Sequence, residues 1–77
     1  MVVGFVLVKT RPHQENVVFD ELKTLKGISD ASMLFGEYDI IVKIEARDFN
    51  TLGKYVLKHI RGLPGVIDTE TLPGAVF

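Results

Sequence analysis

Two short polar clusters hold the side chains best suited to chemistry in this sequence of 77 residues. The first is Gly36-Glu37-Tyr38-Asp39. A glycine lets the backbone present free N–H groups, and a carboxylate beside it can accept charge-assisted hydrogen bonds from a ligand ammonium group. Gly36 and Asp39 are therefore candidates for ligand binding. The alternative is a simple hairpin turn in which Asp39 satisfies its own backbone.

The second cluster is Asp68-Thr69-Glu70-Thr71. Thr69 and Thr71 are two residues apart, so in a strand both hydroxyls project from one face, and Asp68 and Glu70 take the other. The pattern favours two threonine hydroxyls that could bind the same ligand. Threonine is also a good strand former, so a purely structural role stays open.

Other residue types give no catalytic, metal-binding or cofactor site. The two histidines, His13 and His59, have no zinc-ligand spacing, and the sequence has no cysteine. No serine lies in a nucleophile elbow, and no glycine-rich segment has phosphate-binding spacing. We therefore expect a binding protein rather than an enzyme, without metal or cofactor.

The composition further limits the kinds of partner and the location expected for this protein. Nine Lys and Arg stand against ten Asp and Glu, a net charge of −1, so direct binding to nucleic acid or to an anionic membrane is not expected. No apolar run has membrane-spanning length and no signal peptide is recognisable, so the expected location is cytoplasmic. The length fits one domain over residues 1–77, small enough to favour oligomerisation.

The elements that must position these clusters follow from hydrophobic periodicity. Strands are expected at residues 2–9, 28–35, 38–46 and 66–72, with a short apolar tail at 75–77 after Pro73-Gly74. Helices are expected at residues 14–26 and 48–63, the second capped by Asp48. The order is βαββαβ.

The chain also repeats itself at a shift of 38 residues. Leu25-Lys26-Gly27-Ile28-Ser29-Asp30 falls on Leu63-Pro64-Gly65-Val66-Ile67-Asp68, and Val18 and Leu22 fall on Val56 and Ile60. Two βαβ halves with right-handed crossovers predict an α+β, ferredoxin-like sandwich, with a four-stranded antiparallel sheet and both helices on one face. The open face then carries Val3, Phe5 and Leu7, and this apolar strip predicts a sheet-to-sheet dimer contact, unless the tail or a loop covers it.

Together, the two clusters resemble the RAM domain, the C-terminal effector-binding domain of the Lrp/AsnC family of transcriptional regulators. Gly36-Glu37-Tyr38-Asp39-Ile40-Ile41 resembles the family's G-x-Y-D motif and the strand after it. Leu63-Pro64-Gly65-Val66 with Thr69 and Thr71 resembles its PGV-x-x-T-x-T ending. The resemblance extends from Val2 to Leu72.

The resemblance implies an amino-acid or similar small effector, bound between dimers near Gly36, Tyr38, Asp39, Thr69 and Thr71. It also implies homodimers that assemble into rings, most commonly octamers. The family's helix-turn-helix has no counterpart here, so we expect a stand-alone module that acts alone or with full-length relatives. Two alternatives share the fold: a small dimeric α/β-barrel enzyme of the monooxygenase type and an ACT-like amino-acid sensor.

Overall fold

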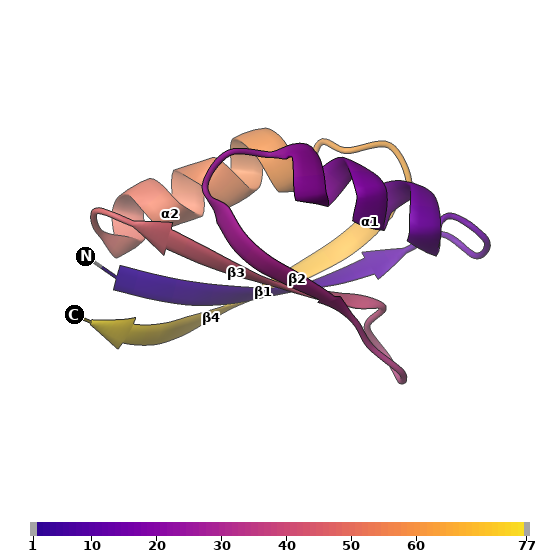
Figure 1. Cartoon of the computed structure of the whole chain (residues 1–77), viewed down its shortest axis with the longest axis horizontal. Helices are drawn as coiled ribbons and strands as arrows, with labels where there is room; N and C mark the ends of the chain where they lie inside the picture. Colours follow the sequence, from indigo (N-terminus) through magenta and orange to yellow (C-terminus); the bar gives the residue numbers. More distant parts are fainter. Residues whose placement is uncertain (1, 77) are drawn as a thin grey trace.

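The computed structural model describes residues 2–76, in which two helical segments cover one face of a four-stranded antiparallel sheet (Figure 1). The strand order is β2-β3-β1-β4. The strands are β1 (Val2–Thr10), β2 (Ile28–Met33), β3 (Ile40–Ala46) and β4 (Val66–Val76). The helices are α1 (Glu15–Thr24), α2 (Phe49–Tyr55) and η1 (Val56–Ile60). The predicted ferredoxin-like α+β fold is confirmed.

The core lies between the helices and the two central strands. Alternate residues of a strand point to opposite faces, and those that point to the helices form the core. The buried strand residues in this core are Val2, Val6 and Val8 of β1 and Ile40, Val42 and Ile44 of β3. The first helix adds Val18 and Leu22, and the second segment adds Leu52, Val56 and Ile60.

The second helical segment begins with a side-chain cap and ends with a widened turn. The Asp48 carboxylate accepts a hydrogen bond from the backbone N of Thr51 at 2.7 Å. From Val56 the helix changes to π geometry, and the backbone N of Arg61 donates to the carbonyl of Val56 at 2.9 Å. The sequence predicted one regular helix over residues 48–63. The wider turn keeps Leu52, Val56 and Ile60 in line, because a spacing of four residues drifts around an ordinary helix of 3.6 residues per turn.

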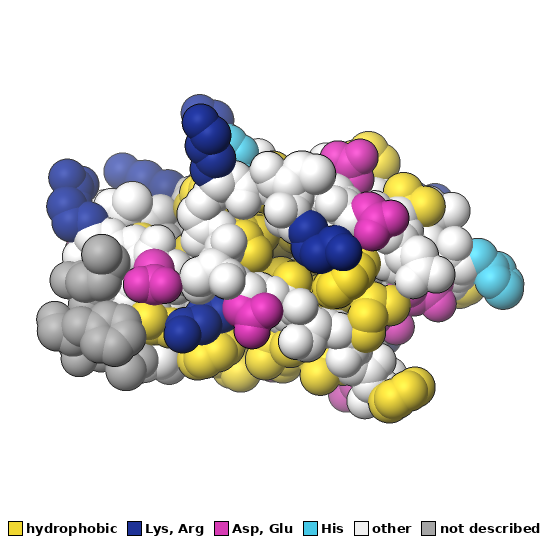
Figure 2. Space-filling view, in the orientation of Figure 1, with side chains coloured by type: hydrophobic (Ala, Val, Ile, Leu, Met, Phe, Trp, Pro, Cys, Tyr) yellow, Lys and Arg dark blue, Asp and Glu magenta, His cyan; other side chains and the backbone are white. Residues whose placement is uncertain are grey.

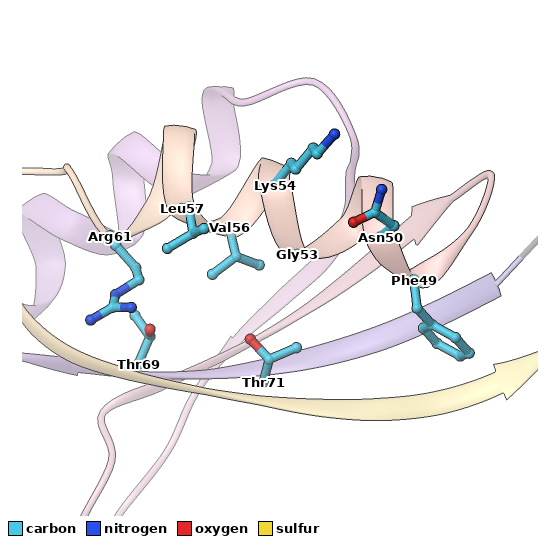
Figure 3. Close-up of a pocket in the computed structure, with 9 residues that line it drawn as sticks. All are labelled: Phe49, Asn50, Gly53, Lys54, Val56, Leu57, Arg61, Thr69 and Thr71. Atoms are coloured by element: carbon cyan, nitrogen blue, oxygen red, sulfur yellow. The ribbon is translucent and has the colours of Figure 1, made fainter.

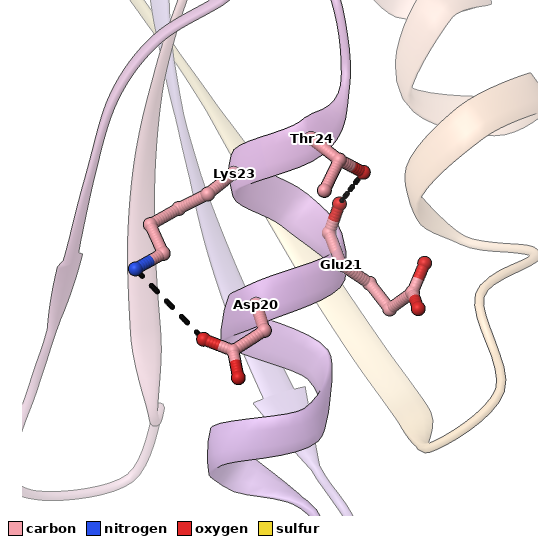
Figure 4. A network of polar contacts seen from close by, with 4 residues as sticks. All are labelled: Asp20, Glu21, Lys23 and Thr24. Atoms are coloured by element: carbon pink, nitrogen blue, oxygen red, sulfur yellow. Dashed lines mark hydrogen bonds and ion pairs between the residues drawn. The ribbon is translucent and has the colours of Figure 1, made fainter.

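The exposed surface of α1 carries polar contacts beside one apolar residue, Val17. Lys23 pairs with Asp20 at 3.8 Å, and the Thr24 hydroxyl donates to the carbonyl of Glu21 at 2.7 Å (Figure 4). Both contacts are exposed, so each adds little stability. They are typical of a solvated helix surface.

The 38-residue repeat is present in the backbone. Gly27 and Gly65 have φ values of +95° and +94°, in the region that side chains rarely adopt. Each glycine lies in the turn after a helical segment and directly precedes a strand. Three residues later in each half, Asp30 and Asp68 accept a bond from the next backbone N at 2.9 Å. The two halves therefore share the same helix-to-strand junction, as the repeat predicts, while the second helical segment differs by its π turn.

The last strand is longer than expected. Pro73 and Gly74 do not start a tail but continue β4 to Val76, and Phe77 lies outside the described residues. β4 tolerates the proline because it is an edge strand, where one side of the backbone has no strand partner. At the other edge, β2 ends at Met33 and leaves Leu34 and Phe35 in the hairpin.

The open face of the sheet is partly apolar. Phe5 and Leu7 are half-buried, while Val3 is only 3% exposed although it lies outside the core cluster. Leu72 of β4 pairs with Phe5 and is 41% exposed. In Figure 2, hydrophobic side chains gather along the underside of the molecule, away from the helices. Among residues 2–76, the helices are too short or too polar to cross a membrane.

Candidate functional site

The hairpin between β2 and β3 carries the first predicted cluster. It is closed by a hydrogen bond from the backbone N of Leu34 to the carbonyl of Asp39 at 2.8 Å. Gly36 has a φ of +118°, and a Cβ built there meets no atom within 4 Å. The turn therefore selects glycine for its backbone conformation, and it leaves open space beside that backbone.

Asp39 connects this hairpin to the end of β1. Its Oδ2 accepts hydrogen bonds from the backbone N of Thr10 at 2.8 Å and from the Thr10 hydroxyl at 3.1 Å. Its own backbone N donates to the carbonyl of Val8 at 2.9 Å. Thr10 is 5% exposed, so these bonds also satisfy a buried polar side chain. The Asp39 carboxylate is therefore held in a fixed position.

Gly36 and Asp39 line the same open depression, of about 580 Å³. We call it the hairpin depression; its lining residues are His13, Glu15, Asn16, Met33, Leu34, Phe35, Gly36 and Asp39. Two of them are carboxylates, and no Lys or Arg is among them. Its electrostatics therefore favour a cationic group. Phe35, at the hairpin, is fully exposed at 106%.

Tyr38 lies in a different place. It does not line the hairpin depression, and the charges that act on its phenol include two on β4. Loss of solvent, followed by the carboxylates of Glu70, Asp68 and Glu37, raises the pKa of Tyr38 above its usual value of 10.0. Glu70, the carboxylate with the largest effect on Tyr38, pairs with Leu7 on the open side of the sheet. The Tyr38 phenol stays protonated at neutral pH and can donate a hydrogen bond.

Thr69 and Thr71 lie on one face of β4, as their spacing predicts, and this face is the helix side. They pair with the buried residues Val8 and Val6 of β1. Both line an open groove of about 420 Å³ between β4 and the second helical segment (Figure 3). We call it the helix–strand groove; its lining residues are Phe49, Asn50, Gly53, Lys54, Val56, Leu57, Arg61, Thr69 and Thr71.

The structure therefore separates the five predicted ligand-binding residues. Gly36 and Asp39 share one depression, Thr69 and Thr71 share another, and Tyr38 lines neither. Within one chain the two pairs do not meet at one ligand.

The two histidines have separate environments. The His59 ring lies 4.6 Å from the Tyr55 ring, tilted by 44°. The Tyr55 hydroxyl in turn donates to the carbonyl of Lys26, and burial raises its pKa above 10.0. His13 borders the hairpin depression, and its positive φ of 69° is uncommon for a residue with a side chain. Among the described residues, no group of His, Asp and Glu is placed to hold a metal ion.

Sequence reasoning missed Thr10 and Arg61. Thr10 ends a strand and gave no motif; only the β1–β3 register, with Val8 opposite Ile40, brings it to Asp39. Arg61 lies near the end of the helix expected over residues 48–63, where a basic residue is common. A signal was available in residues 49–63, which carry Lys54, Lys58 and Arg61 but no acidic residue.

Curated relatives match most of this chain but only part of their own length. An uncharacterised HTH-type transcriptional regulator from Pyrococcus furiosus is 28% identical over 72 residues, covering 90% of this chain and 48% of the relative. The chain thus spans about half the length of such regulators. A homocitrate synthase from Sulfurisphaera tokodaii is 38% identical over 50 residues, which cover 65% of this chain and 11% of the enzyme.

Solved structures include both a chain that is matched over its whole length and a longer regulator that is matched over half of its length. FFRP-DM1 superposes with a TM-score of 0.90 at 31% identity, over 97% of this chain and all of that chain. A transcriptional regulator from Neisseria meningitidis, solved in complex with L-Met, has the same fold, with a TM-score of 0.83 at 19% identity; the match covers 97% of this chain and 50% of the regulator. The family model for the Lrp/AsnC ligand binding domain matches residues 3–73, almost the entire chain. The predicted resemblance is confirmed: this chain belongs to the Lrp/AsnC ligand-binding domain family.

Proposed function

We propose that residues 1–77 act as one effector-binding module, which recognises the ammonium end of an amino acid at Asp39. The observation that best supports this proposal is that hydrogen bonds hold the Asp39 carboxylate in place. Thr10 engages Oδ2 through two hydrogen bonds, and the hydrogen bonds found among residues 2–76 leave Oδ1 for a ligand. A carboxylate that is already oriented loses little freedom on binding, which favours affinity.

The rest of the hairpin depression suits the other parts of an amino acid. The free backbone around Gly36 can donate to the α-carboxylate, because the positive φ exposes it and no side chain blocks the approach. Met33, Leu34 and Phe35 offer apolar surface to a side chain. A relative of the same fold was solved with L-Met, which supports an amino acid as the ligand class.

We propose that Tyr38, Thr69 and Thr71 reach the effector from another copy of the chain. They do not line the hairpin depression of their own chain, so any contact with the same ligand needs a second subunit. The apolar strip of Val3, Phe5 and Leu7 would be covered in a sheet-to-sheet dimer. Such dimers would assemble into rings, with an octamer as the expected size.

The chain's place in regulation follows from its relatives. They are named as HTH-type transcriptional regulators, so we propose that effector binding here controls transcription in the cytoplasm through partners that carry a helix-turn-helix. The net charge of −1 supports an indirect role rather than DNA binding by residues 1–77. We propose binding rather than catalysis, because the homocitrate synthase match covers only 11% of that enzyme.

The test is calorimetric titration with each of the twenty amino acids, followed by Asp39→Asn for the strongest binder. We expect the substitution to weaken binding by roughly ten- to a hundredfold, because a charge-assisted bond contributes about 1.5–3 kcal/mol. Asp30→Asn, on the exposed part of β2, is the matched control and should keep the wild-type affinity. Equal affinities of Asp39→Asn and wild type would exclude Asp39 from the site.

A further inference from the structure

We propose that the effector of this module is an amino acid with a cationic side chain, of the lysine or arginine type, and that Glu15 binds the terminal cation. The proposal rests on the proposed function, in which Asp39 takes the α-ammonium group in the hairpin depression. It adds the residues of that depression that select the side chain of the ligand.

The charges in the hairpin depression do not match an amino acid with a neutral side chain. Glu15 and Asp39 are the two carboxylates of the lining, and no Lys or Arg lines it. A neutral amino acid brings one ammonium group and one carboxylate, so it would pair with Asp39 and leave Glu15 without a cation. Closure of the site around such a ligand would remove water from an unpaired carboxylate, which is unfavourable. A second positive charge on the ligand removes this penalty.

Glu15 is not neutralised by a cation of its own chain. Among residues 2–76, the two ion pairs found use other carboxylates, those of Asp20 and Asp48. Arg11, four residues before Glu15 in the sequence, does not line the hairpin depression. The partly buried Glu15 carboxylate is therefore available to a cation that enters the depression from outside.

The turn before α1 places Glu15 beside the hairpin. The backbone N of Arg11 donates to the carbonyl of Gly65 at 2.8 Å, and the backbone N of Gln14 donates to the carbonyl of Arg11 at 3.0 Å. These bonds attach the turn to the second half of the chain and fix the point where α1 begins. Figure 1 shows this turn and the β2–β3 hairpin at the same end of the molecule. Glu15 and Asp39 thus line one space from two elements that are far apart in the sequence.

Phe35 supplies a second kind of contact for a cation. It lines the depression and is fully exposed, so its ring gains nothing from hydrophobic burial within the single chain. The face of an aromatic ring attracts a cation, and a guanidinium can stack on the ring while it pairs with a carboxylate. Met33 and Leu34, in the same lining, suit the apolar stem of a long cationic side chain. Carboxylate, aromatic ring and apolar surface together therefore fit a lysine or arginine side chain.

The experiment compares ligands that differ at the charged end of the side chain. L-lysine is paired with L-norleucine, and L-arginine with L-citrulline, in calorimetric titrations of the full chain. We expect at least one cationic ligand to bind roughly ten- to a hundredfold more tightly than its neutral counterpart, because it adds a charge-assisted bond. Equal affinities within both pairs, or no binding of either cationic ligand, would overturn the proposal.

Glu15→Gln should weaken the cationic ligand roughly ten- to a hundredfold and leave its neutral counterpart within twofold. Glu21→Gln is the matched control, because it removes the same charge from an exposed position of α1 that does not line the depression. It should keep the wild-type affinity for both ligands. Glu15 also lies in the first turn of α1, where a carboxylate stabilises the helix dipole. If Glu15→Gln weakens both ligands equally, Glu15 acts through the helix or through another copy of the chain, and the proposal is wrong.

Asp39→Asn separates this proposal from the proposed function. It should weaken both ligands of a pair by the same factor, because both carry the α-ammonium group. If it does so while cationic and neutral ligands bind equally well to wild type, the amino-acid site stands and only the cationic class is wrong. If Asp39→Asn keeps the wild-type affinity for all four ligands, the proposed function fails, and the selection of a cationic side chain beside Asp39 fails with it.

Discussion

The Asp39 carboxylate and Thr10 are joined by two hydrogen bonds, from the threonine backbone N at 2.8 Å and from its hydroxyl at 3.1 Å. These bonds attach the β2–β3 hairpin to the end of β1, a strand at the centre of the sheet. Asp39 therefore has a structural role besides its proposed role in binding. A loss of affinity on substitution must be separated from a loss of stability.

Asp39→Ala should lower both the affinity for the amino acid and the stability of the fold. Removing the carboxylate leaves the Thr10 N–H and hydroxyl without their partner in a nearly buried position, at a cost of about 1–3 kcal/mol. A shift of about 4–8 °C in Tm per kcal/mol is usual for a domain of this size. Thermal unfolding followed by circular dichroism, together with calorimetric titration of the amino acid, measures both effects.

Thr10→Val is the control for that experiment. It removes the bond from the Thr10 hydroxyl but keeps the bond from the backbone N and the Asp39 carboxylate. We expect a stability loss of about 1 kcal/mol with little change in amino-acid affinity. If Thr10→Val weakens binding as strongly as Asp39→Ala does, Asp39 acts through hairpin stability alone.

Phe5→Asp tests the proposed sheet-to-sheet dimer. Phe5 is half-buried in the single chain and lies beside Leu72 on the open face. A carboxylate buried there without a partner in a dimer would be strongly unfavourable, so the variant should sediment as a monomer. Val3 is a poorer probe, because it is already buried at 3% exposure within one chain.

Val17→Asp is the matched control for the dimer experiment. Val17 is 55% exposed on α1, on the other side of the sheet. The same change of charge there should leave the sedimentation coefficient at the wild-type value. If Phe5→Asp also sediments like wild type, the apolar strip is not the contact.

The fold could be predicted because its signal is local and repeated. Val18 and Leu22 recur as Val56 and Ile60, and all four are buried in the core. Gly27 and Gly65 marked where β2 and β4 begin, although the helices end earlier than expected, at Thr24 and Ile60. The extension of β4 past Pro73 was missed because proline normally ends a strand, and only an edge position tolerates it.

The candidate site could be predicted only in part, because each half of it depends on long-range pairing. The G-x-Y-D motif identified Asp39, but Thr10 reaches it only through the sheet register. Spacing placed Thr69 and Thr71 on one face correctly. It could not show that this face borders a groove with Arg61, because that contact depends on how the helix packs against β4.

Gly65→Ala should destabilise the fold markedly. Gly65 has a φ of +94°, and an added Cβ would lie 2.9 Å from the Val18 side chain in the core. Strain of this kind costs about 1–3 kcal/mol, before the clash with Val18 is added. Gly53→Ala is the control: it lies in α2, where an added Cβ meets nothing within 4 Å. It should stabilise the protein by about 0.5–1 kcal/mol in urea unfolding.

The Asp48 cap should make the stability of the fold depend on pH in the acidic range. The hydrogen bonds from Thr51, and to a smaller extent the nearby Arg47, hold the pKa of Asp48 below its usual value of 3.8. A group whose pKa is lowered by folding adds stability above its unfolded pKa and loses it as the pH falls through the folded one. Asp48→Ala should therefore lower Tm at neutral pH, and the difference from wild type should shrink below pH 3.8. A constant difference down to pH 2 would contradict a role for the charge.

The position of Tyr38 can be tested through its neighbours on β4. Glu70 is the charge with the largest effect on the Tyr38 phenol, after the loss of solvent. Glu70→Gln should therefore lower the pKa of Tyr38 toward 10.0, while Glu45→Gln, on the exposed end of β3, should leave it unchanged. Tyrosine ring signals in an NMR pH titration resolve Tyr38 from Tyr55. Because folding raises both tyrosine pKa values, their stabilising contribution is complete below pH 10 and is lost as the pH rises further. An unchanged Tyr38 titration in Glu70→Gln would mean that the hairpin places its phenol away from β4 in solution.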